Sequence, residues 1–120
     1  MLIVLDLDNF KYINDTYGHQ AGDQCLKVIA ECLKKAYSRY GNCYRIGGDE
    51  FCVLFREPKK EKYCREKFYW IIEKRKKSLH MLPGASYGSA LIEEQESISD
   101  TKARADANMY ANKKARKQAR

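Results

Sequence analysis

The chain has 120 residues, of which 44% are apolar and 12% aromatic, and its formal net charge is +7. The apolar and aromatic content excludes a disordered chain. The length is sufficient to bury the core of one domain, residues 1–120. No apolar run approaches bilayer length, and the first residues lack the basic region and cleavage site of a signal peptide. We therefore expect a cytoplasmic protein with no membrane segment.

Much of the positive charge lies in residues 56–77 and in the tail, 113–120. Such runs are most often solvated helix faces, and the alternative is a polyanionic partner, either nucleic acid or the phosphates of a nucleotide. The aromatic side chains between 63 and 70 fit base stacking or the buried side of a helix. The five cysteines form no C-x-x-C pair, which favours buried reduced thiols over disulfides or metal ligands.

The first half of the chain begins with "LIVLDL" at 2–7, which is typical of a buried strand with an acidic end. Apolar residues at helical spacing then predict a helix from Gly22 to about Tyr40.

A hairpin follows, with "NCYRI" at 42–46 and "FCVLF" at 51–55 as its strands. Gly47-Gly48 is its expected two-residue turn, because glycine accepts the positive φ that such turns require.

The second half predicts a charged helix over about 60–81, a strand at 85–92 and a last helix capped by Ser99 or Asp100. The residues expected to face inward in the first of these helices include Tyr63, Ile71 and Ile72. In the last helix, the residues expected to form one face are Ala103, Ala107, Tyr110 and Ala111. The order β-α-β-β-α-β-α indicates an α/β (α+β) fold, with helices flanking a central mixed sheet that contains one antiparallel hairpin.

Carboxylates stand at two strand ends: Asp6 and Asp8 close the first strand, and Asp49 and Glu50 lie in the hairpin. If these strands are neighbours, Asp6 and Asp49 converge, and each resists ionisation unless a cation sits between them. Such oxygen ligands suit Mg²⁺, which keeps several waters and also binds substrate phosphates. A glycine turn would let a triphosphate lie against the backbone. The alternative is a surface turn with solvated acids.

Two long motifs identify a family. "DLDNFKYINDTYGHQAGD" at 6–23 resembles the first signature of the GGDEF-domain diguanylate cyclases, and "RIGGDEF" at 45–51 matches their naming motif. Downstream, "ASYGSA" and "ADANMYANKK" resemble a strand and a helix of the same family. The resemblance spans the whole chain and implies a fold like that of nucleotidyl cyclase and polymerase palm domains.

The resemblance implies a bacterial signalling enzyme that condenses two GTP into cyclic di-GMP and two pyrophosphates, with two domains facing each other as a transient homodimer. It places Mg²⁺ or Mn²⁺ on Asp6, the backbone carbonyl of Leu7 and Asp49. Asp49 is also the expected base for the 3′ proton, and Glu50 would support the metal. Lys11 would steady charge in the transition state.

The remaining implied contacts concern the substrate. Asn14 and Asp23 match the guanine readers, a chemically apt pair because a carboxylate accepts from guanine N–H groups. Gly47 and Gly48 would lie against the triphosphate. Lys113 and Lys117 are expected to contact phosphates, whereas His19, Phe10 and Arg45 are interpreted as mostly structural residues.

Three departures from the family pattern stand out. The tail motif K-x-x-G-R-N keeps its lysine as Lys113, but its arginine is Lys117, with Arg116 beside it. The R-x-x-D of the inhibitory product site is replaced at both positions, Ser38 and Gly41. The family's leading helix and final strand are missing. We therefore expect a fragment of reduced activity, with an exposed apolar patch, that lacks an upstream sensor or dimerisation domain.

Two other functions stay open. One is a GGDEF domain that binds GTP as a regulatory module without turnover. The other is a nucleic-acid-binding domain, which depends on the basic runs alone and is disfavoured.

Overall fold

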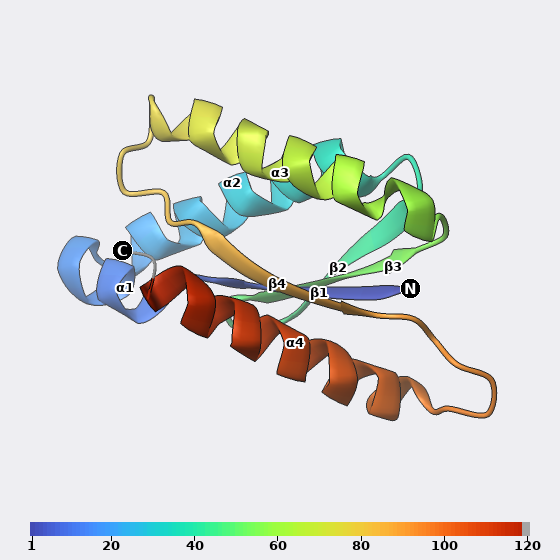
Figure 1. Ribbon diagram of the computed structural model, residues 1–120. Coiled ribbons are helices and arrows are strands. Elements are labelled where there is room, and N and C mark those ends of the chain that lie inside the picture. Colours follow the sequence, from blue (N-terminus) through green and yellow to red (C-terminus); the bar gives the residue numbers. More distant parts are fainter. Residues whose placement is uncertain (119–120) are drawn as a thin grey trace.

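One four-stranded sheet forms the centre of the computed structural model, which describes residues 1–118, and its two central strands carry most of the β-branched and leucine side chains (Figure 1). The strands are β1 (Leu2–Leu7), β2 (Gly41–Gly47), β3 (Glu50–Phe55) and β4 (Ala85–Ala90). Their order is β2-β3-β1-β4, and every neighbouring pair is antiparallel. The predicted α/β (α+β) class is confirmed, but the sheet is antiparallel throughout rather than mixed.

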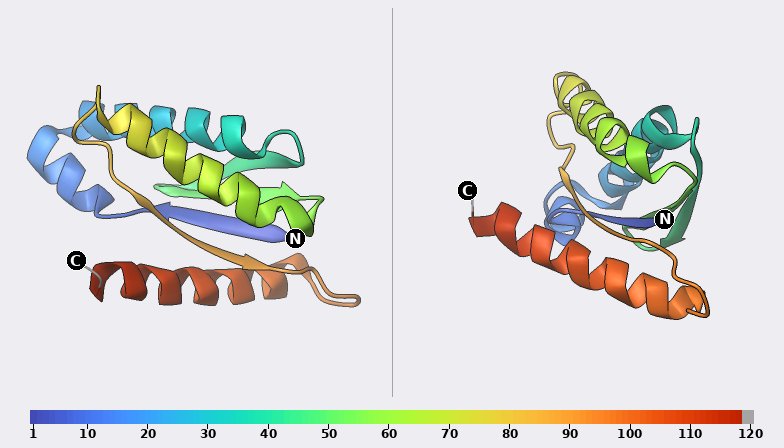
Figure 2. Two further views of the ribbon diagram at one scale, coloured as in Figure 1. Left: turned by 45° about the horizontal axis from the view of Figure 1, so that its top comes forward. Right: turned by 45° about the vertical axis from the view of Figure 1, so that its right-hand side comes forward.

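Helices cover both faces of this sheet. They are α1 (Phe10–Tyr17), α2 (His19–Tyr37), the 3₁₀ turn η1 (Pro58–Lys60), α3 (Glu61–Lys76) and α4 (Ile98–Gln118). The two long helices α2 and α3 lie side by side on one face, and α4 lies on the other (Figures 1 and 2). Within residues 1–118, no helix combines the length and the hydropathy that a bilayer span requires.

The core has two parts because successive strand residues point to opposite faces of the sheet. Ile3 and Leu5 face α2 and α3, where Phe68 of α3 is also fully buried. Val4 and Cys52 face α4 and pack with Ala105. Four of the five cysteines are buried, Cys43 is partly buried, and all five are free, as the sequence predicts.

Several predicted boundaries are wrong by a few residues. The helix expected from Gly22 begins at His19 and ends at Tyr37. The charged helix ends at Lys76 rather than 81, and α4 begins at Ile98, ahead of the expected caps. Helix α1 is not among the predictions at all, because Ile13 is its single buried residue.

The hairpin turn lies one residue later than expected. β2 extends to Gly47, and the turn itself is Gly48-Asp49, with a register shift between Arg45 and Gly47. Both glycines do adopt positive φ, 158° and 34°. The Arg45 guanidinium donates two hydrogen bonds to the Gly48 carbonyl, at 3.0 and 2.7 Å, which confirms the structural interpretation of Arg45. Asp49 therefore occupies the turn.

The predicted helix faces are partly wrong. Ile72 is buried and Ile71 half-buried, but Tyr63 is 63% exposed. In α4, the four residues expected to form one face are all exposed: Ala103, Ala107, Tyr110 and Ala111. The helix instead buries Thr101 and Ala105 against β4.

An exposed apolar patch is present, as expected. α4 covers β4 and β1, and three apolar side chains of β2 and β3 stay open to solvent. Tyr44 is 46% exposed, Ile46 44% and Leu54 38%.

Candidate functional site

Two carboxylates meet at one rim of the sheet. Asp6 is the penultimate residue of β1 and lies opposite Glu50 of β3, so the turn residue Asp49 comes next to it. The Leu7 amide donates to the Asp49 carbonyl at 3.2 Å, which fixes the turn against β1. The predicted convergence of Asp6 and Asp49 is therefore confirmed.

The two acids interact strongly. Burial and the neighbouring Asp6 carboxylate together raise the pKa of Asp49 to about 6. Asp6 Oδ1 is buried and has no hydrogen-bond partner among the described residues. A carboxylate pair with an unused buried oxygen fits a hard cation. Residues 1–118 hold no group of three or more His, Cys, Asp or Glu side chains for a metal, so the rest of a shell would come from backbone, water or substrate.

A lysine from the end of the chain contacts this pair. Lys113 of α4 donates to Asp6 Oδ2 at 2.7 Å. Burial lowers the pKa of Lys113, but its hydrogen bond to Asp6 and the nearby acid charges outweigh burial and raise it. The rim therefore combines two carboxylates with one firmly charged ammonium.

Glu50 contacts a different cation. Its carboxylate lies 3.2 Å from Lys102 of α4, which is also 2.8 Å from Asp106. Glu50 is thus adjacent to Asp6 across the β1–β3 pair, while its ion pair is with the first half of α4.

Asp8 is the site residue that sequence reasoning left without a role. It is 6% exposed, accepts a hydrogen bond from Ser86 Oγ at 2.6 Å and pairs with Arg116 at 3.0 Å. A small pocket of about 130 Å³ lies beside it, lined also by Asn9, Lys113 and Lys117. The available signal was the spacing in "DLD", which puts Asp6 and Asp8 on one face of a buried strand.

The positions of the cations in this pocket depend on the contacts that hold the C-terminal half of α4. Arg116 pairs with Asp8 and also lies over the Tyr69 ring, 5.3 Å from its centroid. Lys113 and Lys117 lie within one turn of Arg116, so this contact places both at the rim.

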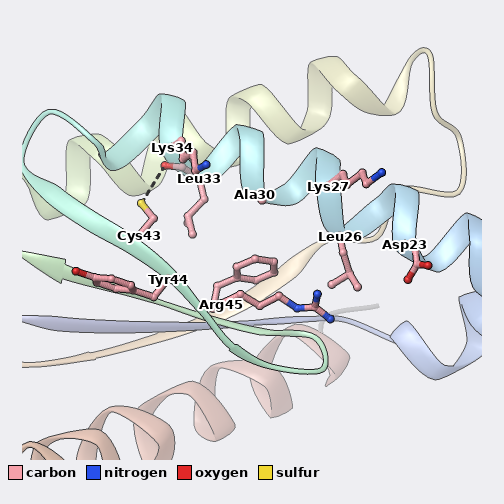
Figure 3. A pocket seen from close by; sticks show the side chains of 10 residues that line it. Asp23, Leu26, Lys27, Ala30, Leu33, Lys34, Cys43, Tyr44 and Arg45 are labelled. Carbon is pink, nitrogen blue, oxygen red and sulfur yellow. Dashed lines mark hydrogen bonds between the residues drawn. The ribbon is translucent and has the colours of Figure 1, made fainter.

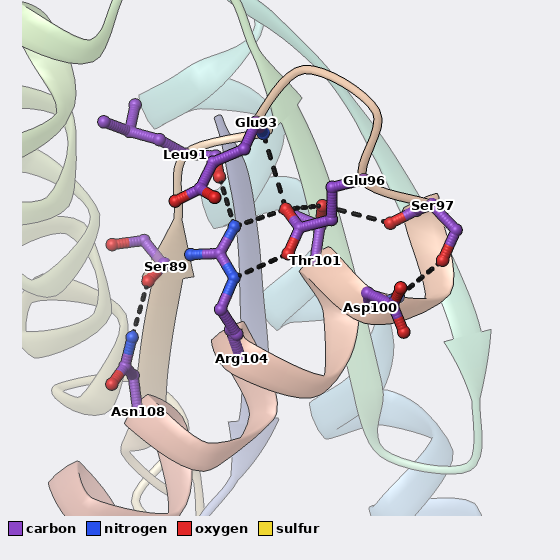
Figure 4. Close-up of polar contacts among 9 residues, drawn as sticks. All are labelled: Ser89, Leu91, Glu93, Glu96, Ser97, Asp100, Thr101, Arg104 and Asn108. Carbon is purple, nitrogen blue, oxygen red and sulfur yellow. Dashed lines mark hydrogen bonds and ion pairs between the residues drawn. The ribbon is translucent and has the colours of Figure 1, made fainter.

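The N-terminal end of α4 is held by a polar network that Figure 4 shows. Glu96 accepts from Arg104 Nε at 2.8 Å and from Thr101 at 2.7 Å, and these two hydrogen bonds lower the pKa of Glu96 to about 2. Ser97 Oγ accepts from the Asp100 amide at 3.1 Å, which makes Ser97 the capping residue rather than Ser99 or Asp100.

The predicted guanine readers lie on neighbouring helices, Asn14 on α1 and Asp23 near the start of α2. The Asn14 amide of α1 packs against the Cα of Gly22, where any Cβ would overlap Asn14 Oδ1. Asp23 is the next residue and is exposed. Lys11 lies on α1, 93% exposed, and its ion pair is with Asp15 at 3.6 Å rather than with a residue of the rim.

A groove of about 520 Å³ begins at Asp23 and runs between α2 and the β2–β3 hairpin (Figure 3). Its lining residues are Asp23, Leu26, Lys27, Ala30, Leu33, Lys34, Cys43, Tyr44, Arg45 and Phe51. The Cys43 thiol donates to the Leu33 carbonyl, and burial raises the pKa of Cys43 to about 11. This thiol therefore lines the groove without being reactive. Sequence reasoning did not find this groove, because its walls belong to separate elements.

Comparison with known proteins decides the family. Residues 1–119 match the family described as "Diguanylate cyclase, GGDEF domain". The chain belongs to this family. The sequence resemblance of the two motifs is thereby confirmed.

Relatives share this domain within longer chains. The chain is 34% identical over 119 residues to "Probable diguanylate cyclase DgcJ" of Escherichia coli K12, covering 94% of this chain and 23% of DgcJ. It is 51% identical over 53 residues to "Diguanylate cyclase DgcS" of Shewanella oneidensis, covering 44% of this chain and 18% of DgcS. The chain thus spans about a fifth of the length of these curated relatives.

Solved GGDEF structures share the fold. The GGDEF domain of DgcB from Caulobacter crescentus, solved in complex with c-di-GMP, matches with a TM-score of 0.83 and 32% identity over 95% of this chain and 71% of that one. Diguanylate cyclase SiaD of Pseudomonas aeruginosa, solved with its activator SiaC, matches with a TM-score of 0.83 and 28% identity over 95% of this chain and 46% of SiaD.

Proposed function

We propose that this GGDEF domain condenses two GTP molecules into cyclic di-GMP and releases two pyrophosphates. The observation that carries the proposal is the coupled pair Asp6 and Asp49, which leaves a buried carboxylate oxygen free beside the Lys113 ammonium. Membership of the diguanylate cyclase family supports the same chemistry.

Asp6, the Leu7 carbonyl and Asp49 are the groups that would hold Mg²⁺ or Mn²⁺, with Glu50 supporting them from the neighbouring strand position. The bound cation would offset charge on the transferring phosphoryl group and lower the pKa of the attacking hydroxyl. Asp49, with a pKa of about 6, is suited to accept the 3′ proton near neutral pH.

The cations of α4 would bind the phosphates. Lys113 and Lys117 line the pocket beside Asp8, and Lys113 would exchange its contact with Asp6 for a phosphate oxygen. Lys11, whose side chain is exposed on α1, would approach the phosphate charge from the α1 side of the site. The backbone of Gly47 and Gly48 offers no side chains to obstruct a triphosphate at the hairpin.

Asn14 and Asp23 would read the guanine base. Gly22 allows the Asn14 amide to pack against the helix that carries Asp23, and Asp23 lines one end of the groove. A carboxylate there accepts from the two guanine N–H groups, which adenine does not present in that arrangement.

The reaction needs two GTP-loaded domains, because each 3′-hydroxyl attacks the α-phosphate of the other substrate. A transient homodimer is therefore part of the proposal, and an upstream sensor or dimerisation domain would hold the two copies together. For the isolated chain, the initial rate should rise more steeply than linearly with protein concentration.

The deciding experiment measures cyclic di-GMP formation from GTP and Mg²⁺ over a range of protein concentrations. Asp49→Ala should abolish product while leaving the circular dichroism spectrum unchanged, and Glu94→Ala, which removes an exposed loop acid, should leave activity intact. Turnover by the Asp49→Ala variant at the wild-type rate would sink the assignment of the metal site.

One observation favours the alternative of a GTP-binding regulatory module without turnover. The tail arginine of the family is a lysine here, and the neighbouring Arg116 is committed to Asp8. Lysine keeps the charge but loses the bidentate fork that grips phosphate. GTP binding by calorimetry, with no product at any protein concentration or on a dimerising fusion, would establish this alternative.

A further inference from the structure

Most of the net charge of the molecule lies away from the rim, on and around α3. Residues 56–77 hold ten basic and four acidic residues, a net +6 out of +7 for the whole chain. α3 lies on the α2 side of the sheet, and α4, which carries Lys113 and Lys117, lies on the opposite side (Figures 1 and 2). The proposed cyclase reaction therefore makes no use of this charge.

The outward face of α3 alternates aromatic and basic side chains. Tyr63, Lys67, Trp70, Lys74 and Lys77 recur every three or four residues, and we call this row the α3 stripe. All five are exposed, with Tyr63 at 63% and Trp70 at 62%. The stripe is about 21 Å long at the rise of an α-helix.

The arginines of α3 are turned away from the stripe. Arg65 lies 3.3 Å from Glu61 and stacks on the Tyr87 ring of β4, and Arg75 pairs with Glu31 of α2 at 3.0 Å. The cations that remain on the outer face are lysines. Lysine is a point charge on an apolar stem, whereas base reading and bidentate phosphate contacts favour arginine.

The aromatic residues give the stripe an apolar component. The Lys74 ammonium lies over the Trp70 ring, 5.1 Å from its centroid, and Trp70 remains mostly exposed to solvent. Tryptophan and tyrosine combine an apolar body with a polar tip, a combination enriched where a helix lies in a lipid headgroup layer. Lysine stems can lie along the same layer with their charges in water.

From this arrangement, we propose that the α3 stripe docks on an anionic lipid surface. The net charge supplies long-range attraction, and Trp70 and Tyr63 enter the headgroup region. The apolar contribution is limited to two side chains, so binding is peripheral, reversible and sensitive to salt. Because α4 lies on the other side of the sheet, docking leaves the rim in solution. The inference is independent of the proposed cyclase reaction.

The protein carries its own reporter, because Trp70 is the single tryptophan of the chain. The intact chain is mixed with vesicles of phosphatidylcholine alone and with vesicles of equal parts phosphatidylcholine and phosphatidylglycerol. We expect Trp70 emission to shift to the blue and to become protected from acrylamide with the anionic vesicles only, and the shift to disappear in high salt. No shift with anionic vesicles overturns the proposal.

Sedimentation with the anionic vesicles tests the charges. Lys67→Gln/Lys74→Gln should lower the partition constant about 30-fold, since each lysine contributes about a fivefold factor near such a surface. The matched control is Arg39→Gln/Lys114→Gln, which removes the same charge from exposed positions on α4 and beyond the end of α2. An equal loss in the control means attraction by net charge alone and refutes docking by the stripe.

Oligonucleotides provide the competing outcome. Single- and double-stranded DNA are titrated against the same tryptophan signal. Quenching of Trp70 by DNA, at concentrations where anionic vesicles produce no shift, would assign the stripe to nucleic acid instead and overturn the lipid proposal. Unchanged emission with DNA, together with the blue shift on vesicles, supports it.

Discussion

The substitution Asp49→Asn should stabilise the metal-free protein, although it destroys the proposed metal site. In the folded state the ionised Asp49 carboxylate is partly buried beside Asp6, which raises its pKa from 3.8 to about 6. Because the folded-state pKa is raised, ionisation of Asp49 opposes folding. The penalty is complete above about pH 6, shrinks as the pH falls towards 3.8 and is absent below that value. A neutral asparagine removes it.

The magnitude follows from the shift. About two pKa units correspond to roughly 3 kcal/mol at 1.36 kcal/mol per unit. Asp49 is partly exposed at the rim, so solvent screening reduces the expected gain to about 1 kcal/mol. For a domain of this size, that gain raises Tm by roughly 4 °C.

The assay is thermal unfolding in a chelator at about pH 7.5 and about pH 5, followed by circular dichroism. Asp49→Asn should exceed wild type in Tm at the higher pH, and the difference should shrink at the lower pH. Excess Mg²⁺ should stabilise wild type more than the variant. Glu94→Gln, an exposed loop acid, serves as the charge-matched control and should not change Tm. Equal Tm values for Asp49→Asn and wild type at both pH values would refute the coupling of the two acids.

Three further predictions concern the proposed substrate and product sites. Asp23→Ala should weaken GTP binding about tenfold, because the guanine N–H groups lose their acceptor in the complex and an unpaired buried polar group costs roughly 1–3 kcal/mol. Calorimetry checks this, and equal affinity of wild type for ATP and GTP would contradict it. Gly22→Ala should displace the Asn14 side chain and lower GTP affinity with little loss of Tm, because the side chain can rotate away; unchanged GTP affinity would argue against the role of Asn14. Cyclic di-GMP should not bind tightly at Ser38 and Gly41 when the active site is blocked. Ser38→Arg/Gly41→Asp should lower Tm instead of restoring a product site, because a Cβ at Gly41 would lie 2.6 Å from a β3 carbonyl oxygen. Submicromolar product binding by wild type or by this variant would overturn the prediction.

The sheet and its hairpin could be predicted from sequence because their signals are local. The run at 2–7 and the paired glycines each point to one structure. Helix α1 gives a weaker signal, because its apolar period, Phe10, Ile13 and Tyr17, spans only eight residues and buries one side chain, Ile13. Its boundaries are instead set by Asn9 and Gly18, both at positive φ, and conformations of this kind have only a weak sequence signature.

The buried face of α4 could not be read from hydropathy. Alanine is frequent around this helix, so choosing apolar residues selects a face that the structure leaves exposed. The true face is decided by Gly88 of β4, where a Cβ would overlap the Ala105 carbonyl and the Met109 amide. Such close backbone approach is a property of two packed elements and not of either sequence alone.

The candidate site likewise has contacts that the sequence could predict and contacts that it could not. Asp6 and Asp49 could be brought together by assuming neighbouring strands, because pairing and register follow from the strand pattern. The contact of Lys113 with Asp6 joins residues 107 positions apart, and that of Arg116 with Asp8 joins residues 108 positions apart. The family resemblance suggested phosphate contacts for Lys113, but neither periodicity nor composition could say that α4 folds back onto the end of β1.

The attachment of α4 by Arg116 and Asp8 has a consequence for local stability. The acids of the rim belong to the central pair β1 and β3, whereas the cations proposed to bind phosphate belong to a helix end that two ion pairs, Lys113 with Asp6 and Arg116 with Asp8, and the Tyr69 ring hold in place. Helix ends open at a far lower free energy than central strands. Unwinding the last turns of α4 would therefore disassemble half of the proposed substrate site while the sheet stays folded. A binding partner that grips or releases this helix end thus has control over substrate affinity without approaching the carboxylates.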